Sequence, residues 1–359
     1  MSRPTYMNID LIALKYNLER VRALASGRSV IAMVKANAYG HGLSRVAHAL
    51  SNADALGVAS LEEGLVLRDA GITQSIVLIE GVFSSEEIAE AARNHFILVV
   101  HHIPHVEMLE KVKVDKPFTV WLKINTGMNR LGIQPAQFQN VYQRLLKAES
   151  VKNPIGLMTH FADADGMDSD ATIKQLAIFN KITEQSIGPR SLANSAAILA
   201  FPETHGDWVR PGLMLYGASP FSGKCGVEHD LKPVMTLWSR LIAINQVKKG
   251  DKVGYGGTFT APEDLLIGVV GVGYGDGYPQ FAKNGTPVLV NGVECPLAGR
   301  VSMDMLTVDL RDQPHANIGD RVVLWGEGLP VERVAKASDT SPYEILTRMT
   351  PRPKIEVSS

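Results

Sequence analysis

The feature that most constrains the fold is an alternation of short apolar runs with helical patterns between about residue 10 and residue 217. Eight apolar runs of strand length occur there, and each is followed by a helix or a short helical turn. Runs such as SVIAMV at 29–34 and SIVLIE at 75–80 lack polar alternation, which is typical of strands covered on both faces. Repeated strand–helix units predict a parallel sheet. Eight of them favour a closed (β/α)8 TIM barrel over a doubly wound open sheet.

Helix N-terminal signals separate these runs. Asp10 can cap a helix that continues through Ala25. Two capping boxes, in which a serine is followed three residues later by a glutamate, occur at Ser60–Glu63 and Ser84–Glu87. Each of them predicts a helix directly after an apolar run.

The hydrophobic pattern changes after Pro233, where strands of alternating polarity separated by glycine-rich turns begin. Asn291-Gly292 lies between PVLV and VECP, a pattern that predicts a hairpin with a type I′ turn. Near the end, Ser341 begins a short helix with proline and glutamate in its first turn. We therefore expect two domains, the (β/α)8 barrel at residues 1–230 and a mainly β domain at residues 231–359.

Charge and cysteine content exclude several classes of protein. Lys and Arg number 36 against 37 Asp and Glu, so no basic excess indicates a nucleic-acid or anionic-membrane partner. The two cysteines form neither a disulfide framework nor a zinc pattern. No secretory signal precedes the first helix, and the longest apolar stretch, Leu265–Gly275, is too short to span a bilayer. We expect a cytoplasmic protein. Because HExxH, CxxC and histidine clusters are absent from the pattern, we expect no metal site.

Chemically useful residues follow three of the predicted barrel strands, and barrels place their active sites at these strand ends. Lys35 follows four apolar residues, which favour the neutral amine, and an amine can form a Schiff base with an aldehyde. Ser195 and Gly212 follow strands seven and eight, where barrels commonly bind phosphate. An aldehyde that carries a phosphate describes pyridoxal 5′-phosphate. The structural alternatives are a lysine that reaches solvent, a helix cap and a turn glycine.

Four cationic or titratable residues accompany this set. Arg210 stays protonated, so it would donate a hydrogen bond to a pyridine nitrogen and leave that nitrogen unprotonated, unless it forms a surface salt bridge. Lys123 and Arg130 lie seven residues apart. Three arrangements stay open for them: a substrate carboxylate on Arg130, a carbamate on Lys123, or a lysine that reaches solvent. His160 is a ligand, an acid–base group or a core histidine.

The ordered motifs of both halves resemble those of bacterial alanine racemases. The similarity runs in order over nearly the whole chain. The matching segments are VKANAYGHG at 34–42, TGMNRLG at 126–132, THF at 159–161, NSAA at 194–197, VRPG at 209–212, VGYGG at 253–257, GYGDG at 273–277, GRVSMD at 299–304, and Tyr343.

The resemblance implies a cofactor site with pyridoxal phosphate on Lys35. It also implies that Arg210 bonds the pyridine nitrogen. Five residues would hold the phosphate, namely Tyr39, Ser195, Gly212, Leu213 and Tyr343. His160 and Asn194 complete the predicted cofactor-binding set.

The resemblance further implies a substrate site shared between two chains of a homodimer. Arg130 and the backbone of Met303 would hold the alanine carboxylate, and Lys123 would be carbamylated beside Arg130. Tyr255 would be the second catalytic base and would come from the partner chain. Tyr274 and Met303 would narrow the site from the same partner. Family members often carry arginine shortly after the GYGDG motif, where this chain has Gln280.

The implied activity is the interconversion of L-alanine and D-alanine through a cofactor aldimine, with Lys35 serving the D-enantiomer and Tyr255 the L-enantiomer. It would supply D-alanine for peptidoglycan or act in alanine catabolism. Three alternatives share parts of the pattern. A barrel-type pyridoxal-phosphate decarboxylase would place a carboxylate where Arg210 stands. A non-catalytic pyridoxal-phosphate homeostasis protein resembles the barrel alone. A racemase of broader specificity tends to be exported.

Overall fold

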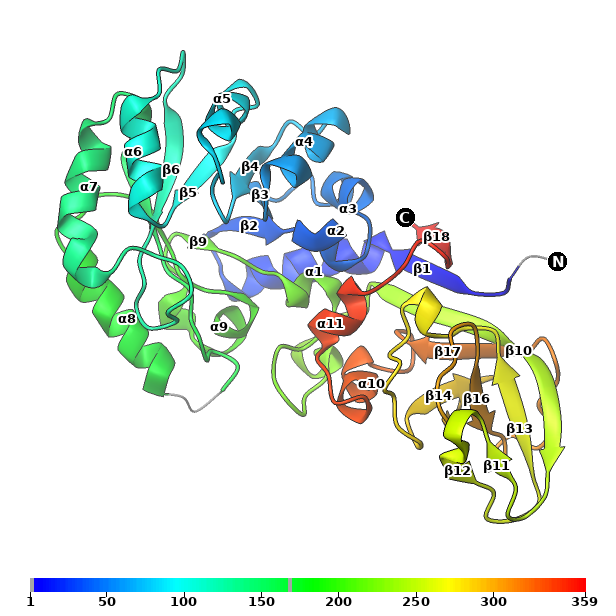
Figure 1. Ribbon diagram of the computed structural model, residues 1–359. Coiled ribbons are helices and arrows are strands. Elements are labelled where there is room, and N and C mark those ends of the chain that lie inside the picture. Colours follow the sequence, from blue (N-terminus) through cyan, green and yellow to red (C-terminus); the bar gives the residue numbers. More distant parts are fainter. Residues whose placement is uncertain (1–2, 167–169) are drawn as a thin grey trace. The chain divides into compact units, whose positions relative to one another are not determined.

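The computed structural model describes residues 3–166 and 170–359, and the chain divides into two compact units. The first unit comprises Leu18–Leu215. The second combines the chain up to Asn17 with Tyr216–Ser359 (Figure 1). Within the described residues, the helices are too short or too polar to cross a membrane.

Eight strands form a closed barrel in the first unit, and every pairing between neighbours is parallel. Their order around the barrel equals their order along the chain, and β2 pairs with β9 to close the ring. The expected (β/α)8 barrel is confirmed, and the open sheet is excluded. The strands are β2 (Ser29–Met33), β3 (Ala55–Val58), β4 (Ser75–Leu78), β5 (Ile97–Val100), β6 (Phe118–Lys123), β7 (Val151–Met158), β8 (Arg190–Ser191) and β9 (Trp208–Val209).

Helices cover the outside of the strands, as Figure 1 shows for α4 to α8. This cover explains the uninterrupted apolar runs, because all four residues of β3, for example, are buried. The helices of this unit after β2 are α2 (Lys35–Tyr39), α3 (Leu43–Ala49), α4 (Leu61–Asp69), α5 (Ser85–Arg93), α6 (Ile103–Lys111), α7 (Phe138–Lys147), α8 (Asp170–Thr183) and α9 (Ser195–Ala200).

The expected helix caps are confirmed in part. Asp10 Oδ1 accepts hydrogen bonds from the backbone at positions 12 and 13, and it caps α1 (Leu11–Leu24). Ser60 Oγ caps α4. The carboxylate of Glu63 does not bond the N–H of Ser60, because it accepts from the N–H groups of Ala36 and Ala59 instead. The Ser84 hydroxyl bonds the Glu86 side chain and does not cap α5. The Ser60–Glu63 box therefore forms only its serine half, and the Ser84–Glu87 box does not form, since Glu87 accepts from the N–H of Phe83.

A largely antiparallel sheet forms the second unit. β10 (Met235–Val247) is its central strand, and it pairs with β1, β13 and β17. Asn291 and Gly292 both have positive φ between β14 and β15, which confirms the expected Asn-Gly hairpin. The remaining elements are β11 (Lys252–Val253), β12 (Phe259–Thr260), β13 (Leu265–Val270), β14 (Pro287–Val290), β15 (Val293–Pro296), β16 (Leu306–Asp309), β17 (Arg321–Trp325), β18 (Lys354–Ser358), α10 (Val331–Ala337) and α11 (Pro342–Thr347).

The N-terminal strand is the main difference from the expected organisation. β1 (Tyr6–Asp10) pairs antiparallel with β10 and parallel with β18. The start of the chain is therefore part of the β sheet. The compact units also divide at Leu215 and Tyr216, whereas the sequence analysis placed the boundary at residues 230 and 231. The five residues of β1 end on the capping Asp10, and so short a segment carries no information about which sheet it joins.

The turn into β8 provides a test of the barrel packing. Gly188 has φ +154°, and an added Cβ would collide with the carbonyl oxygen of Ile155 in β7. Gly71 is a matched control, since its φ is +82° and nothing lies within 4 Å of an added Cβ. Gly71→Ala should lower the free energy of unfolding by about 1–2 kcal/mol through backbone strain alone. Gly188→Ala should cost about 1–3 kcal/mol more, because overpacking adds to the strain. Urea unfolding followed by circular dichroism measures both. Equal losses would show that β7 relaxes to accept the methyl group.

Candidate active site at the carboxyl end of the barrel

Lys35 lies two residues beyond β2 and begins α2, a short turn whose backbone is left-handed rather than α-helical. The four residues 36–39 have φ between 52° and 55°, in the left-handed region. Each such residue costs about 1–2 kcal/mol for an L-amino acid, so the surrounding structure must hold the turn in place. The Lys35 side chain is half-buried.

Three side chains stabilise this left-handed turn. Glu63 in α4 accepts a 2.7 Å hydrogen bond from the backbone N–H of Ala36. Asn37 Oδ1 accepts one of 2.9 Å from the N–H of Leu43. His41 is fully buried, and its Nδ1 lies 2.8 Å from the carbonyl oxygen of position 39. Burial lowers the pKa of His41 to about 4, so the neutral ring donates its Nδ1–H to that carbonyl.

The predicted phosphate residues of the barrel come together from three segments. Ser195 Oγ, at the start of α9, accepts a 2.9 Å hydrogen bond from the N–H of Gly212. A Cβ at Gly212 would lie 2.5 Å from the phenol oxygen of Tyr39, so a larger residue there would displace the Tyr39 side chain. Leu213 is buried and follows directly. Asn194 Oδ1 accepts from the Ala197 N–H, and it therefore caps α9.

Arg210 is buried, with 5% of its surface exposed, and it is held by neutral groups. Its guanidinium donates to Ser191 Oγ at 2.7 Å and to the carbonyl oxygens of Thr159 at 2.6 Å and Leu192 at 3.1 Å. A fourth contact, of 3.3 Å, joins it to Nδ1 of His160. Burial lowers the pKa of Arg210 to about 10, which still leaves it protonated at neutral pH. Burial of the ring, together with the positive charge of Arg210, holds the pKa of His160 well below its usual value.

Four cations crowd the carboxyl end of the barrel. Lys123, at the end of β6, is only 5% exposed. Burial, together with the charges of Arg210, Arg130 and Lys35, lowers its pKa to about 8, against an opposing effect of Glu80. Like charges at this density favour an anion between them, and they favour a neutral amine at Lys123. The site is therefore built for anionic groups such as phosphate and carboxylate.

The exposed Arg130 is carried by a loop that the end of β6 fixes in place. Asn125 Oδ1 accepts from the N–H groups of Gly127 and Asn129, and its Nδ2 donates to Asn129 Oδ1 at 2.9 Å. Backbone bonds between Ile133 and residues 123 and 125 close the base of the loop. The guanidinium thus reaches solvent from a rigid support.

Sequence reasoning missed Gln175 in α8. This buried amide accepts from the N–H of Ala162 at 2.9 Å, and it donates to Thr126 Oγ1 at 3.1 Å and to the carbonyl of His160 at 3.0 Å. It ties the ends of β6 and β7 together beneath the Arg130 loop. A glutamine within a helix carries no sequence signal for this role, and neither does Glu63.

The remaining predicted site residues lie in the β unit. Tyr255 is 74% exposed in a turn whose glycines 254, 256 and 257 have positive φ. Tyr274 and Met303 lie on adjoining segments, because the N–H of Gly275 donates to the Met303 carbonyl at 2.9 Å. Tyr343 is exposed in α11. The structure thus gathers the barrel residues at one end and brings Tyr274 to Met303.

The family models for alanine racemases match both parts of this chain. The model described as "Alanine racemase, N-terminal domain" matches residues 9–220, and the one described as "Alanine racemase, C-terminal domain" matches residues 234–357. The chain belongs to the alanine racemase family.

Relatives in this family match over nearly their full length. "Alanine racemase, biosynthetic" of Escherichia coli K12 is 50% identical over 345 residues, which is 96% of each chain. "Alanine racemase" of Coxiella burnetii is 49% identical over 98% of each chain. The crystal structure of biosynthetic alanine racemase from Pseudomonas aeruginosa superposes with a TM-score of 0.97 at 43% identity, and all of both chains is covered.

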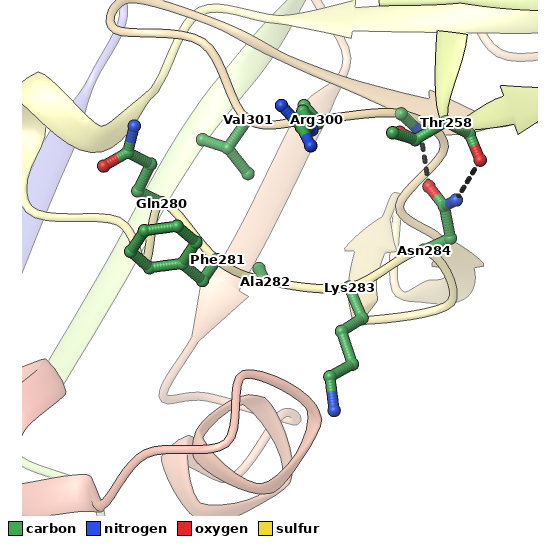
Figure 2. A pocket seen from close by; sticks show the side chains of 9 residues that line it. Thr258, Gln280, Phe281, Ala282, Lys283, Asn284, Arg300 and Val301 are labelled. Carbon is green, nitrogen blue, oxygen red and sulfur yellow. Dashed lines mark hydrogen bonds between the residues drawn. The ribbon is translucent and has the colours of Figure 1, made fainter. Parts of the chain in front are cut away.

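Gln280, the departure from the alanine racemase pattern, lines a pocket of the β unit. Figure 2 shows Gln280, Phe281 and Lys283 along one segment of the lining, with Arg300 on the segment across from it. Asn284 fixes the floor, since it donates to the carbonyl of Thr258 at 2.8 Å and accepts from the N–H of Gly299 at 2.6 Å. The pocket therefore keeps two cationic side chains without an arginine at position 280.

The lowered pKa of Lys123 allows a test of whether its amine forms a carbamate. In carbamate formation the amine nitrogen attacks CO2, a C–N bond forms, and one proton is released to solvent. With a pKa of about 8, about a tenth of the Lys123 amine is neutral at pH 7, against about one part in 2,500 for an ordinary lysine. At a fixed partial pressure of ¹³CO2, a carbamate resonance in the ¹³C NMR spectrum should therefore grow from pH 7 to about pH 9.

Two variants make this assignment specific. Lys123→Gln should lose the resonance and most of the activity. Lys147→Gln, at an exposed position in α7, should keep both. A resonance that survived in Lys123→Gln would assign the carbamate to another lysine, and a spectrum without it at every pH would leave Lys123 a bare amine.

Proposed function

We propose that this chain interconverts L-alanine and D-alanine with pyridoxal 5′-phosphate held on Lys35. The observation that carries the proposal is the gathering of Lys35, Arg210 and the Tyr39–Ser195–Gly212 cradle at the carboxyl end of one barrel. An amine, a fixed cation and a glycine cradle fit an aldehyde phosphate with a basic ring nitrogen. Family membership over both domains supports the same reading.

The cofactor-binding roles follow from the chemistry of each side chain. Tyr39, Ser195, Gly212, Leu213 and Tyr343 would hold the phosphate, and Arg210 would donate to the ring nitrogen. When bound, the cofactor takes up the substrate amino group and withdraws electrons from the α-carbon, so that the α-proton becomes removable. The permanently charged Arg210 keeps the ring nitrogen unprotonated, which moderates that withdrawal and disfavours side reactions.

Racemisation requires a proton to leave one face of the α-carbon and return to the other. Lys35 and Tyr255 would serve as the two bases, with the Lys35 amine on the face of the D-enantiomer and the Tyr255 phenol on that of the L-enantiomer. A positioned base of this kind contributes about 10²–10⁴-fold in rate. Two bases on opposite faces remove the need for the substrate to turn over.

Arg130 would bind the substrate carboxylate through its bidentate fork, assisted by the backbone of Met303. A carbamate on Lys123 would change a repelling cation into an anion, and that anion would orient Arg130 toward the substrate. Tyr274 and Met303 would close the side-chain pocket around a methyl group. A hydrophobic pocket rejects one extra methylene by only about 10–200-fold, so slow turnover of serine is compatible with alanine as the preferred substrate.

A homodimer accounts for the exposure of the β-unit residues. Tyr255, Phe281 and Met303 are 74%, 80% and 53% exposed, and large exposed apolar side chains of this kind mark interaction surfaces. A two-fold arrangement would seat each β unit over the partner's barrel and form two equal sites. The relatives named biosynthetic favour D-alanine supply for peptidoglycan over alanine catabolism.

A chiral product assay tests the activity. The purified chain with added pyridoxal phosphate should convert pure L-alanine to an equal mixture of enantiomers, and borohydride should fix the cofactor to the Lys35 peptide. Release of ethylamine and CO2 would indicate a decarboxylase instead. A bound cofactor without any turnover would indicate a homeostasis protein.

Mixing two inactive variants tests the shared site. Lys35→Ala and Tyr255→Ala chains should each lose activity by about 10²–10⁴-fold. After refolding together, half of the dimers are mixed, and each mixed dimer has one site with both bases and one with neither. Activity should therefore return to about a quarter of the wild-type value. If both bases came from one chain, every mixed site would lack a base, and the mixture would stay inactive.

A further inference from the structure

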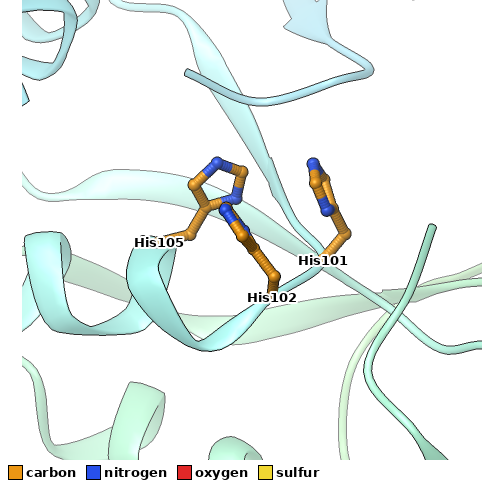
Figure 3. A group of neighbouring side chains, drawn as sticks. All are labelled: His101, His102 and His105. Atoms are coloured by element: carbon orange, nitrogen blue, oxygen red, sulfur yellow. The ribbon is translucent and has the colours of Figure 1, made fainter. Parts of the chain in front are cut away.

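Three histidines form a cluster that the proposed reaction does not use. His101 and His102 follow β5, and His105 lies in the first turn of α6. Figure 3 shows the three imidazoles side by side. One ligand nitrogen from each ring can be chosen such that all three lie within 4.8 Å of one another. The sequence pattern did not predict a histidine cluster here, because these three side chains come together only where the end of β5 bends into α6.

Backbone hydrogen bonds fix which nitrogen of two rings is free. His101 Nε2 lies 2.9 Å from the carbonyl oxygen of Glu80, and His105 Nε2 lies 2.7 Å from that of Val82. A carbonyl only accepts, so both rings carry their proton on Nε2. The Nδ1 atoms are left with free lone pairs. This is the arrangement that orients metal-binding histidines in proteins.

His105 supplies a buried, unsatisfied acceptor to the cluster. The residue is 3% exposed, and its Nδ1 is buried without a hydrogen-bond partner among the described residues. Burial lowers the pKa of His105 to about 3, with smaller contributions from the charges of His102 and His101. The ring is therefore neutral at pH 7. A buried polar atom without a partner costs free energy unless a ligand satisfies it.

We propose that His101, His102 and His105 bind a divalent transition-metal ion of the Zn²⁺ class. Three imidazole ligands suit Zn²⁺, Co²⁺, Ni²⁺ or Cu²⁺ and do not suit Mg²⁺ or Ca²⁺. Tetrahedral bonds of about 2.0–2.1 Å require the nitrogens to approach to about 3.3 Å. His102 is exposed, so its side chain can move to bring its nitrogen within bonding distance of the ion. Three histidines leave the fourth ligand position to water.

The neighbourhood gives this site a connection to the proposed substrate site. His101 and His102 line a pocket together with Asn125, Asn129 and Arg130 of the carboxylate-binding loop. Lys123 lies close enough for its charge to lower the pKa of His101. A metal ion would add positive charge beside these cations. We therefore expect weaker metal binding when Lys123 is a bare cation and tighter metal binding when that charge is removed.

Cobalt titration of the full-length holoenzyme, without an affinity tag or chelator, tests the site by absorption rather than by activity. Co²⁺ should bind saturably at one equivalent per chain and give the visible bands of a tetrahedral nitrogen site. His102→Ala removes an exposed ligand and should weaken binding by at least about 100-fold, since outer-shell changes alone cost about 10–100-fold. His48→Ala, at an exposed histidine of α3, is the matched control and should bind like the wild type.

Crystals soaked in Zn²⁺ provide a second readout that does not depend on any variant. An anomalous peak bonded to Nδ1 of both His101 and His105 is expected. The proposal is overturned if His102→Ala binds Co²⁺ as tightly as the wild type, if no saturable binding occurs up to about 1 mM, or if the anomalous peak lies elsewhere. Metal binding does not require racemase activity, so this test and the test of the proposed function fail independently.

Discussion

The pairing of β2 with β9 is the contact on which the active site depends. Ser29 and Val30 pair with Trp208 and Val209, and the N–H of Met33 donates to the Pro211 carbonyl. This seam closes the barrel and joins segments about 180 residues apart. Lys35 leaves one side of it, while Arg210 and Gly212 leave the other. An open sheet of the same strands would place these groups at opposite edges, where no single ligand could touch them.

Positive charge at the barrel end is tolerated because neutral groups support it. Arg210 bonds two backbone carbonyls and a serine hydroxyl, and it forms no ion pair with a carboxylate of the described residues. Lys123 responds with a lowered pKa, since proton loss relieves both burial and repulsion. Anionic groups of a cofactor and a substrate would reduce the same repulsion between the cations. The electrostatics therefore favour ligand binding before any specific contact is considered.

The left-handed turn after Lys35 shows how local strain is held by distant residues. Left-handed geometry at positions 36–39 is unfavourable for the sequence by itself. Glu63 from α4 and the buried His41 form hydrogen bonds with the backbone of this turn, and these bonds offset part of the cost. The strain aims Tyr39 toward Gly212, where the cradle needs it.

The sequence by itself determined the order of strands and helices, the Asn-Gly hairpin and the motif residues at strand ends. These features depend on local patterns of polarity and on turn chemistry, which act over a few residues. Tertiary structure alone decided that β1 joins the β sheet, that Glu63 bonds Ala36, and that Gln175 links β6 to β7. It also decided that three histidines share one corner. Each of these depends on which distant groups meet when the barrel closes and the sheet forms, and no short stretch of sequence encodes such a meeting.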